Sequence, residues 1–127
     1  MSKPKAAGAG AVAGMTELIF KIVPRAEWES GSGDYHGSAH DQADGYLHLS
    51  TAAQLAETLR RYYAGQDDLI LVAVDPAALG TSLKWEYSPS RGEDFPHLYA
   101  PLSCDAMQWA RPIGKGADGN FVLPEQI

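Results

Sequence analysis

The segment at residues 45–54, which reads GYLHLSTAAQ, constrains the fold more than any other part of the chain. Its tyrosine and leucines favour a short strand, because such side chains fit a pleated, half-buried surface. Thr51 is followed three residues later by Gln54, which is the pattern of a capping box at a helix start. The segment therefore predicts a strand that runs directly into a helix over residues 51–63.

The junction between this strand and helix is a candidate ligand site. His48 is predicted at the end of the strand, with Ser50 and Thr51 at the helix start. A helix N-terminus presents unpaired N–H groups and the positive end of the helix dipole, which favour an anion. A strand histidine that hydrogen-bonds a backbone carbonyl would give the same pattern, so both interpretations stay open.

Composition sets the class of protein. The chain has 127 residues, which favours one domain, and its net charge of -6 makes bulk nucleic-acid binding a poor expectation. Cys104 is the only cysteine, which is compatible with a reducing compartment. No apolar run approaches membrane-spanning length. We therefore expect a soluble, cytoplasmic protein without a membrane partner.

The remaining patterns favour strands over helices. Predicted strands share apolar or alternating residues and cover residues 18–23, 68–74, 83–87, 107–112 and 121–123. A short helix is expected from Pro24, and Pro76 opens a single turn that ends at Gly80. Residues 95–102 contain two prolines, which confine them to a sheet edge or an irregular segment.

These elements predict a single α+β domain over residues 15–127. Its sheets are expected to be curved and mixed or antiparallel, with one main helix. Residues 1–14 are low in complexity and are expected to be a disordered tail or a tag.

Two histidines in the polar segment before residue 45 bear on metal binding. His36 and His40 stand four residues apart, a spacing that suits a metal on a helix. The surrounding glycine, serine and aspartate residues instead predict a polar loop beside the site. A metal-dependent hydrolase using these histidines with His48 and His97 is the least favoured function, and no metal is expected.

Two segments share one arrangement of polar residues. His48 and Ser50 are two apart, as are His97 and Tyr99, and on a strand such pairs point the same way. If the strands converge, one pocket would hold candidate catalytic residues and candidate ligand-binding residues. The candidate catalytic residues are His48, Glu86 and His97. The candidate ligand-binding residues are Ser50, Thr51, Trp85 and Tyr99.

Three motifs in the chain resemble the family called domain of unknown function 952, which is widespread in bacteria. They are GYLHLST with a following Gln, LKWE, and FPHLY with PL two residues on, and the resemblance runs from Leu18 to Leu123. It implies a fold similar to that of ADP-ribosyltransferases, enzymes that split NAD at the nicotinamide–ribose bond. His48 and Ser50 match the strand histidine and hydroxyl of those enzymes. Glu86 and Glu125 are both candidates for their late glutamate.

The resemblance implies two readings of function. The first is an NAD-utilising ADP-ribosyl transferase or NAD glycohydrolase, with NAD as substrate and no firm cofactor. A carboxylate near the ribose would stabilise the oxocarbenium character that develops as the bond breaks. The alternative is a noncatalytic module that binds a nucleotide or another small anion. The oligomeric state stays open.

Overall fold

The computed structural model describes residues 17–30 and 33–124 of the chain. Its strands are β1 (Ile19–Pro24), β2 (Leu47–His48), β3 (Ser50–Thr51), β4 (Leu69–Val74), β5 (Leu83–Ser88), β6 (Glu93–Leu98), β7 (Met107–Lys115) and β8 (Phe121–Val122). Its α-helices are α1 (Arg25–Ser30), α2 (Ala39–Asp44) and α3 (Ala52–Tyr62). Two 3-10 segments are η3 (Pro76–Ser82) and η4 (Cys104–Ala106).

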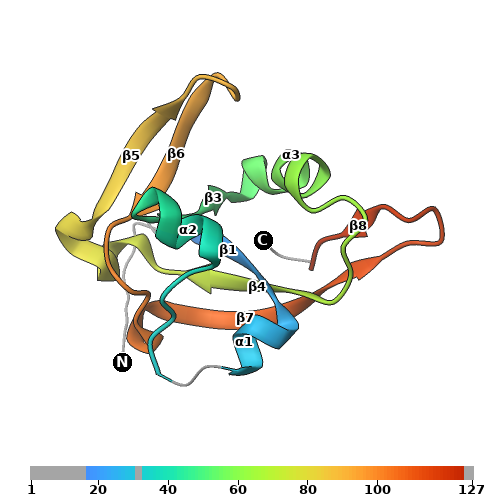
Figure 1. The fold of residues 1–127 in the computed structure, drawn as a ribbon, viewed down its shortest axis with the longest axis horizontal. Coiled ribbons are helices and arrows are strands. Elements are labelled where there is room, and N and C mark those ends of the chain that lie inside the picture. Colours follow the sequence, from blue (N-terminus) through green and yellow to red (C-terminus); the bar gives the residue numbers. More distant parts are fainter. Residues whose placement is uncertain (1–16, 31–32, 125–127) are drawn as a thin grey trace.

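The strands form two antiparallel sheets (Figure 1). One has the order β3-β1-β4-β7-β8, and the smaller one has the order β2-β6-β5. The larger sheet curves beneath α3, while the β5–β6 hairpin projects away from it. The predicted single α+β domain with curved sheets and one main helix is confirmed.

Strand β4 is the centre of the core. It lies between β1 and β7, and all its residues are buried. Ile70, Val72 and Val74 contribute to one apolar cluster. The alternate residues Leu69, Leu71 and Ala73 contribute to a second cluster that includes Leu55 of α3. Each such buried side chain stabilises the fold by about 1.5–3 kcal/mol. The apolar run therefore predicted burial on both faces correctly.

The chain changes sheets at Leu49. Residues 47–48 pair with β6, and residues 50–51 pair with β1, so the prediction of one continuous strand here is wrong. Leu47 and Leu49 both enter the same core cluster, and this burial holds the crossing point in place. The seam between the sheets thus carries His48 on one side and Ser50 on the other.

Helix α3 begins where its capping box predicts. The Thr51 backbone N–H donates to Gln54 Oε1 at 2.9 Å, and the helix extends to Tyr62. Gln54 also donates to the Asp94 carbonyl at 2.7 Å, which joins the helix start to β6. The Gln54 side chain therefore makes both the capping bond that the sequence predicts and a long-range bond to the second sheet.

A short helix lies where a polar loop was predicted. Ser38 caps α2: its side chain accepts from the Asp41 N–H at 3.1 Å, and its own N–H donates to Asp41 Oδ2 at 3.0 Å. Gly45 then ends the helix with a left-handed φ of 89°. The reciprocal cap outweighs the loop-forming composition of the segment, so that prediction is wrong for residues 39–44.

Strand β6 is the central strand of its sheet, although the prolines predicted an edge or an irregular segment. Pro96 pairs with Trp85 of β5, and on its other side its carbonyl accepts from the Leu49 N–H at 3.1 Å. The Pro96 nitrogen, which has no hydrogen to donate, faces the end of β2, where the chain passes into the other sheet. Proline is tolerated here because β2 is so short.

The other predicted strands agree with β1, β4, β5, β7 and β8 to within a few residues. Strand β7 continues to Lys115, beyond the predicted end. The predicted tail at residues 1–14 and the candidate Glu125 lie outside the described residues. Among the helices that are described, none is long and apolar enough to cross a membrane.

Candidate functional site

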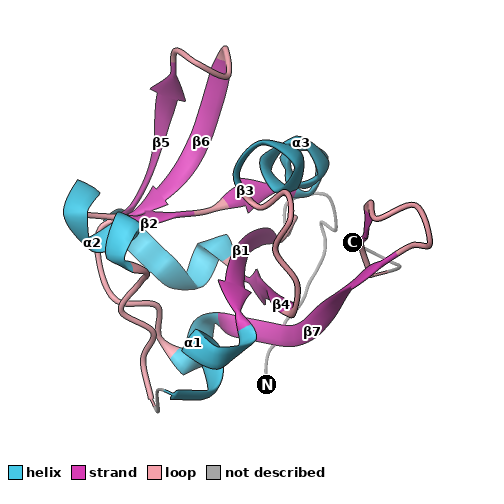
Figure 2. Ribbon diagram, turned by 45° about the vertical axis from the view of Figure 1, so that its right-hand side comes forward, coloured by secondary structure: helices cyan, strands magenta, loops and turns pink. Residues whose placement is uncertain are grey.

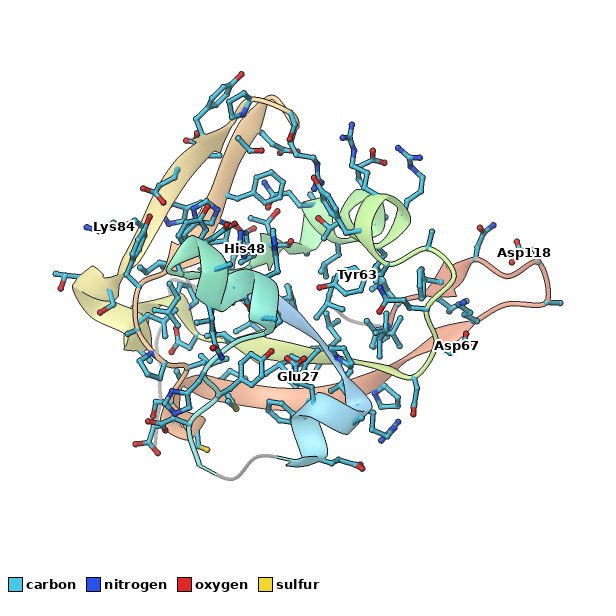
Figure 3. All side chains as sticks on the ribbon, in the orientation of Figure 1. Glu27, His48, Tyr63, Asp67, Lys84 and Asp118 are labelled. Atoms are coloured by element: carbon cyan, nitrogen blue, oxygen red, sulfur yellow. The ribbon has the colours of Figure 1, made fainter. Side chains whose placement is uncertain are left out.

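A cavity of about 720 Å³ opens at the seam between the two sheets. Helices α2 and α3 and the β5–β6 hairpin surround it, and β1 contributes to its floor (Figure 2). Its volume lies within the range of small-molecule sites. In Figure 3, His48 lies beside α2 and Tyr63 lies at the end of α3, and both line the cavity.

Asp41 of α2 is the charged centre of the site. Its side chain is 2% exposed, and Lys21 Nζ lies 2.9 Å from its Oδ2. Its Oδ1 accepts from His48 twice, from ring Nδ1 at 2.6 Å and from the backbone N–H at 3.1 Å. Together with the Ser38 N–H, these donors satisfy a buried carboxylate, which would otherwise be costly.

The ionised form of Asp41 is favoured despite its burial. Burial acts to raise the pKa of Asp41, but the hydrogen bond from His48 and the charge of Lys21 outweigh it. The pKa of the carboxyl is therefore held well below its usual range. An ionised carboxylate can only accept, so His48 carries its hydrogen on Nδ1 and directs Nε2 away from Asp41.

A second carboxylate holds the other histidine. Glu86 Oε1 of β5 accepts from the Tyr99 hydroxyl at 2.7 Å and lies 2.8 Å from His97 Nδ1. These hydrogen bonds, that of Tyr99 first, lower the pKa of Glu86. The same bond raises the pKa of Tyr99 to about 12. Within the described residues, His97 Nε2 has no hydrogen-bond partner.

The rings at the seam are packed against one another. Tyr46 stacks on His97 with centroids 4.1 Å apart, and His48 meets His97 edge-on at 5.6 Å. On its outer side, His48 stacks with His40 of α2 at 4.7 Å. The two histidines predicted to converge therefore lie together, each held at Nδ1 by a carboxylate.

Arg91 contributes a positive charge to the cavity wall. It donates to Thr58 Oγ1 at 3.0 Å, and its guanidinium lies 4.5 Å from the centre of the Phe95 ring. No carboxylate pairs with it among residues 17–30 and 33–124. Arginine presents five N–H donors, so some remain for an anionic ligand.

The structure divides the predicted site residues into three groups. His48, Ser50 and His97 line the cavity. Glu86 and Tyr99 lie behind His97 and reach the cavity through it. The third group lies outside the cavity lining and consists of Thr51 and Trp85.

The helix start is occupied by the protein itself. The Thr51 N–H already donates to Gln54, and Ser50 is buried with its Oγ 3.3 Å from Thr58 Oγ1. Two cationic side chains line the cavity, and Lys21 is paired with Asp41, whereas Arg91, on the turn that joins β5 and β6, has no carboxylate partner among the described residues. This moves the expected anion position from the start of α3 to the side of the hairpin.

Five residues of the site were not among the candidates from the sequence analysis. Lys21 interrupts an apolar strand, which signals a buried charge in need of a partner. Ser38 and Asp41 have the spacing of a capping box, which signals the α2 start. Arg91 carries no local signal that separates it from ordinary loop residues, and Tyr46 was interpreted only as a strand-forming residue.

Fold and site together define an α+β domain with two antiparallel sheets and a charged, aromatic cavity at their seam. The chain belongs to the family described as protein of unknown function, DUF952, whose model matches residues 22–110. No curated protein matches the chain.

Solved structures of protein CC0527 from Caulobacter crescentus are similar to this chain. The X-ray structure has 43% sequence identity to this chain and a TM-score of 0.77. The matched region covers 83% of this chain and 93% of the CC0527 chain. The solution NMR structure is 44% identical with a TM-score of 0.72, and it covers 81% and 90% of the two chains.

Proposed function

We propose that the cavity binds a small phosphate-bearing ligand of the nucleotide class, with NAD and ADP-ribose as the first ligands to test. The observation that carries this proposal is Arg91, a cavity-lining cation without a carboxylate partner among the described residues. Arginine recognises phosphate oxygens through parallel N–H donors. Tyr62, Tyr63 and Phe95 provide aromatic surface on the same wall for a base or nicotinamide ring.

The ADP-ribosyltransferase-like activity expected from the sequence adds a second candidate, which is cleavage or transfer at the ribose of that ligand. The pair of histidines favours it. His48 and His97 lie 5.6 Å apart, and each is held at Nδ1 by a carboxylate. An oriented imidazole can take a proton from water or from an acceptor hydroxyl. In this proposal His97 is the base, and Glu86 orients it.

Binding is tested by calorimetric titration of the whole protein with NAD, ADP-ribose and inorganic phosphate. Arg91→Gln should weaken binding by about tenfold or more, since a hydrogen bond to a charged group is lost. Arg60→Gln is the matched control, because Arg60 lies on the exposed face of α3 paired with Glu57. It should leave the affinity unchanged.

Absence of saturable binding by all three ligands at millimolar concentration would overturn the binding proposal. An equal loss in Arg91→Gln and Arg60→Gln would overturn the position assigned to the phosphate. Turnover is followed separately by free nicotinamide. Release that is lost in His97→Gln while NAD still binds supports the enzyme, and binding without release supports the noncatalytic module.

A further inference from the structure

We propose that His40, Asp44 and His48 form a binding site for one divalent transition-metal ion at the mouth of the cavity. The three residues come from α2 and from the strand that follows it. The site is separate from the anion position at Arg91, and its test requires no nucleotide. The metal site weighed from the sequence combined His40 and His48 with His36 and His97, whereas the present site replaces those last two residues with Asp44.

The ligand atoms are already close to coordination distance. Asp44 Oδ2 lies 3.0 Å from His48 Nε2 and 3.5 Å from His40 Nε2. All three atoms lie within 4.8 Å of one another. Tetrahedral Zn²⁺ with bonds of about 2.0–2.1 Å places its ligand atoms about 3.3 Å apart. For one ion to bind all three atoms, the exposed His40 ring must turn out of its stacking contact with His48 so that its Nε2 points toward the ion.

The arrangement of His48 supports a cation between its Nε2 and Asp44. Asp41 accepts the Nδ1 hydrogen at 2.6 Å, and this bond directs the opposite ring nitrogen, Nε2, away from Asp41. Nε2 lies 3.0 Å from Asp44 Oδ2, so a nitrogen and a carboxylate oxygen that can both bind a cation are side by side. A metal ion satisfies both atoms at once.

Asp41 supplies the outer support that metal-binding histidines ordinarily have. Histidine ligands commonly donate their second ring N–H to a carboxylate, which fixes the tautomer and orientation. Here that carboxylate is anchored by Lys21 and by the Ser38 cap, so the His48 ring is held before any metal binds. Lys21 also balances the charge of Asp41, which leaves Asp44 as the anionic ligand.

Ligand types indicate which metals fit. Two imidazoles and one carboxylate suit Zn²⁺, Co²⁺, Ni²⁺ or Cu²⁺ better than Mg²⁺ or Ca²⁺. Three protein ligands also leave a coordination position open, as in sites where a metal binds water or a ligand oxygen. His40 and His48 line the cavity, so that position is accessible to a cavity ligand.

The test is calorimetric titration of the whole protein with ZnCl₂ near neutral pH, repeated with Co²⁺ to observe its visible absorption. We expect one ion per chain and a Co²⁺ spectrum typical of nitrogen and oxygen ligands. His40→Gln and Asp44→Asn should each weaken binding by about tenfold or more. Both side chains are exposed enough for these variants to fold.

His36→Gln is the matched control, because His36 is an exposed histidine outside the cluster. It should bind Zn²⁺ and Co²⁺ as the wild type does. Wild-type affinity no better than that of His40→Gln would overturn the site, as would an equal loss in His36→Gln. A Co²⁺ spectrum that persists unchanged in Asp44→Asn would overturn the role of Asp44.

Discussion

The Lys21 ammonium lies 2.9 Å from Asp41 Oδ2, and neither side chain is more than 4% exposed. This buried ion pair joins β1 to α2 across the floor of the cavity. Because Asp41 also orients His48, the pair connects the stability of the fold to the geometry of the site. Removing this ion pair should therefore change both the stability of the protein and the orientation of the His48 ring.

Lys21→Met should destabilise the protein by about 3–5 kcal/mol, because it leaves a buried carboxylate without its ion-pair partner. Urea unfolding monitored by circular dichroism gives the measurement. The matched control is Arg25→Gln, which breaks the exposed pair of Arg25 with Asp68 and should change stability little. The double variant with Asp41→Leu should lose less stability than the two single losses added together. A fully additive result would show that the two charges do not stabilise each other.

Leu49→Ala should destabilise the protein by about 2–5 kcal/mol, because Leu49 is 2% exposed at the point where the chain changes sheets. The resulting cavity adjoins His48, so His48 ring resonances in NMR spectra should also shift. Val122→Ala removes an exposed side chain of β8 and serves as the control. If Leu49→Ala were as mild as the control, Leu49 would not anchor the seam.

Gln54→Ala should cost about 1–3 kcal/mol, because buried polar groups at both ends of the Gln54 side chain lose their partner. Gln54 is 5% exposed, accepts from the Thr51 N–H and donates to the Asp94 carbonyl. Thermal unfolding of this variant is compared with that of Gln66→Ala, whose exposed side chain makes one long contact at 3.4 Å. Equal melting temperatures for the two variants would contradict a joining role for Gln54.

Glu86→Gln should lower the pKa of Tyr99 from about 12 toward its ordinary value of 10.0, because the hydrogen-bonded negative charge is removed. NMR of isotope-labelled tyrosine follows that ring during an alkaline titration. Glu29→Gln, on the exposed α1 surface, is the control and should leave the Tyr99 titration unchanged. A Tyr99 pKa that stays at about 12 in Glu86→Gln would refute the assigned cause.

The same hydrogen bond predicts how stability depends on pH. The lowered pKa of Glu86 adds stability that is present above the ordinary value of 4.5 and is lost as pH falls through the folded-state pKa. The raised pKa of Tyr99 adds stability that is present below pH 10.0 and is lost as pH rises through about 12. The free energy of unfolding should be measured from acid to alkaline pH. In Tyr99→Phe it should fall less steeply than in the wild type at both the acid and the alkaline end. A pH dependence of stability that is the same in Tyr99→Phe and in the wild type would contradict the prediction.

The parts of the fold that were predicted correctly are those that patterns of residues close together in the sequence indicate. The run at β4 is apolar throughout, and the spacing of Thr51 and Gln54 identifies the start of α3. Such signals act over a few residues and need no knowledge of the partner strand. The cap from Ser38 to Asp41 is equally local. It was readable in the sequence, but the surrounding glycines favoured the wrong interpretation.

The sequence by itself determined the buried central strand, the main helix and the two histidine segments. Only the tertiary structure decided that Leu49 divides two sheets, that β6 is central, and that Lys21 pairs with Asp41. Strand pairing and buried ion pairs depend on contacts between residues far apart in the chain. Local patterns do not encode the register of those contacts, and the cavity exists only once that register brings both sheets together.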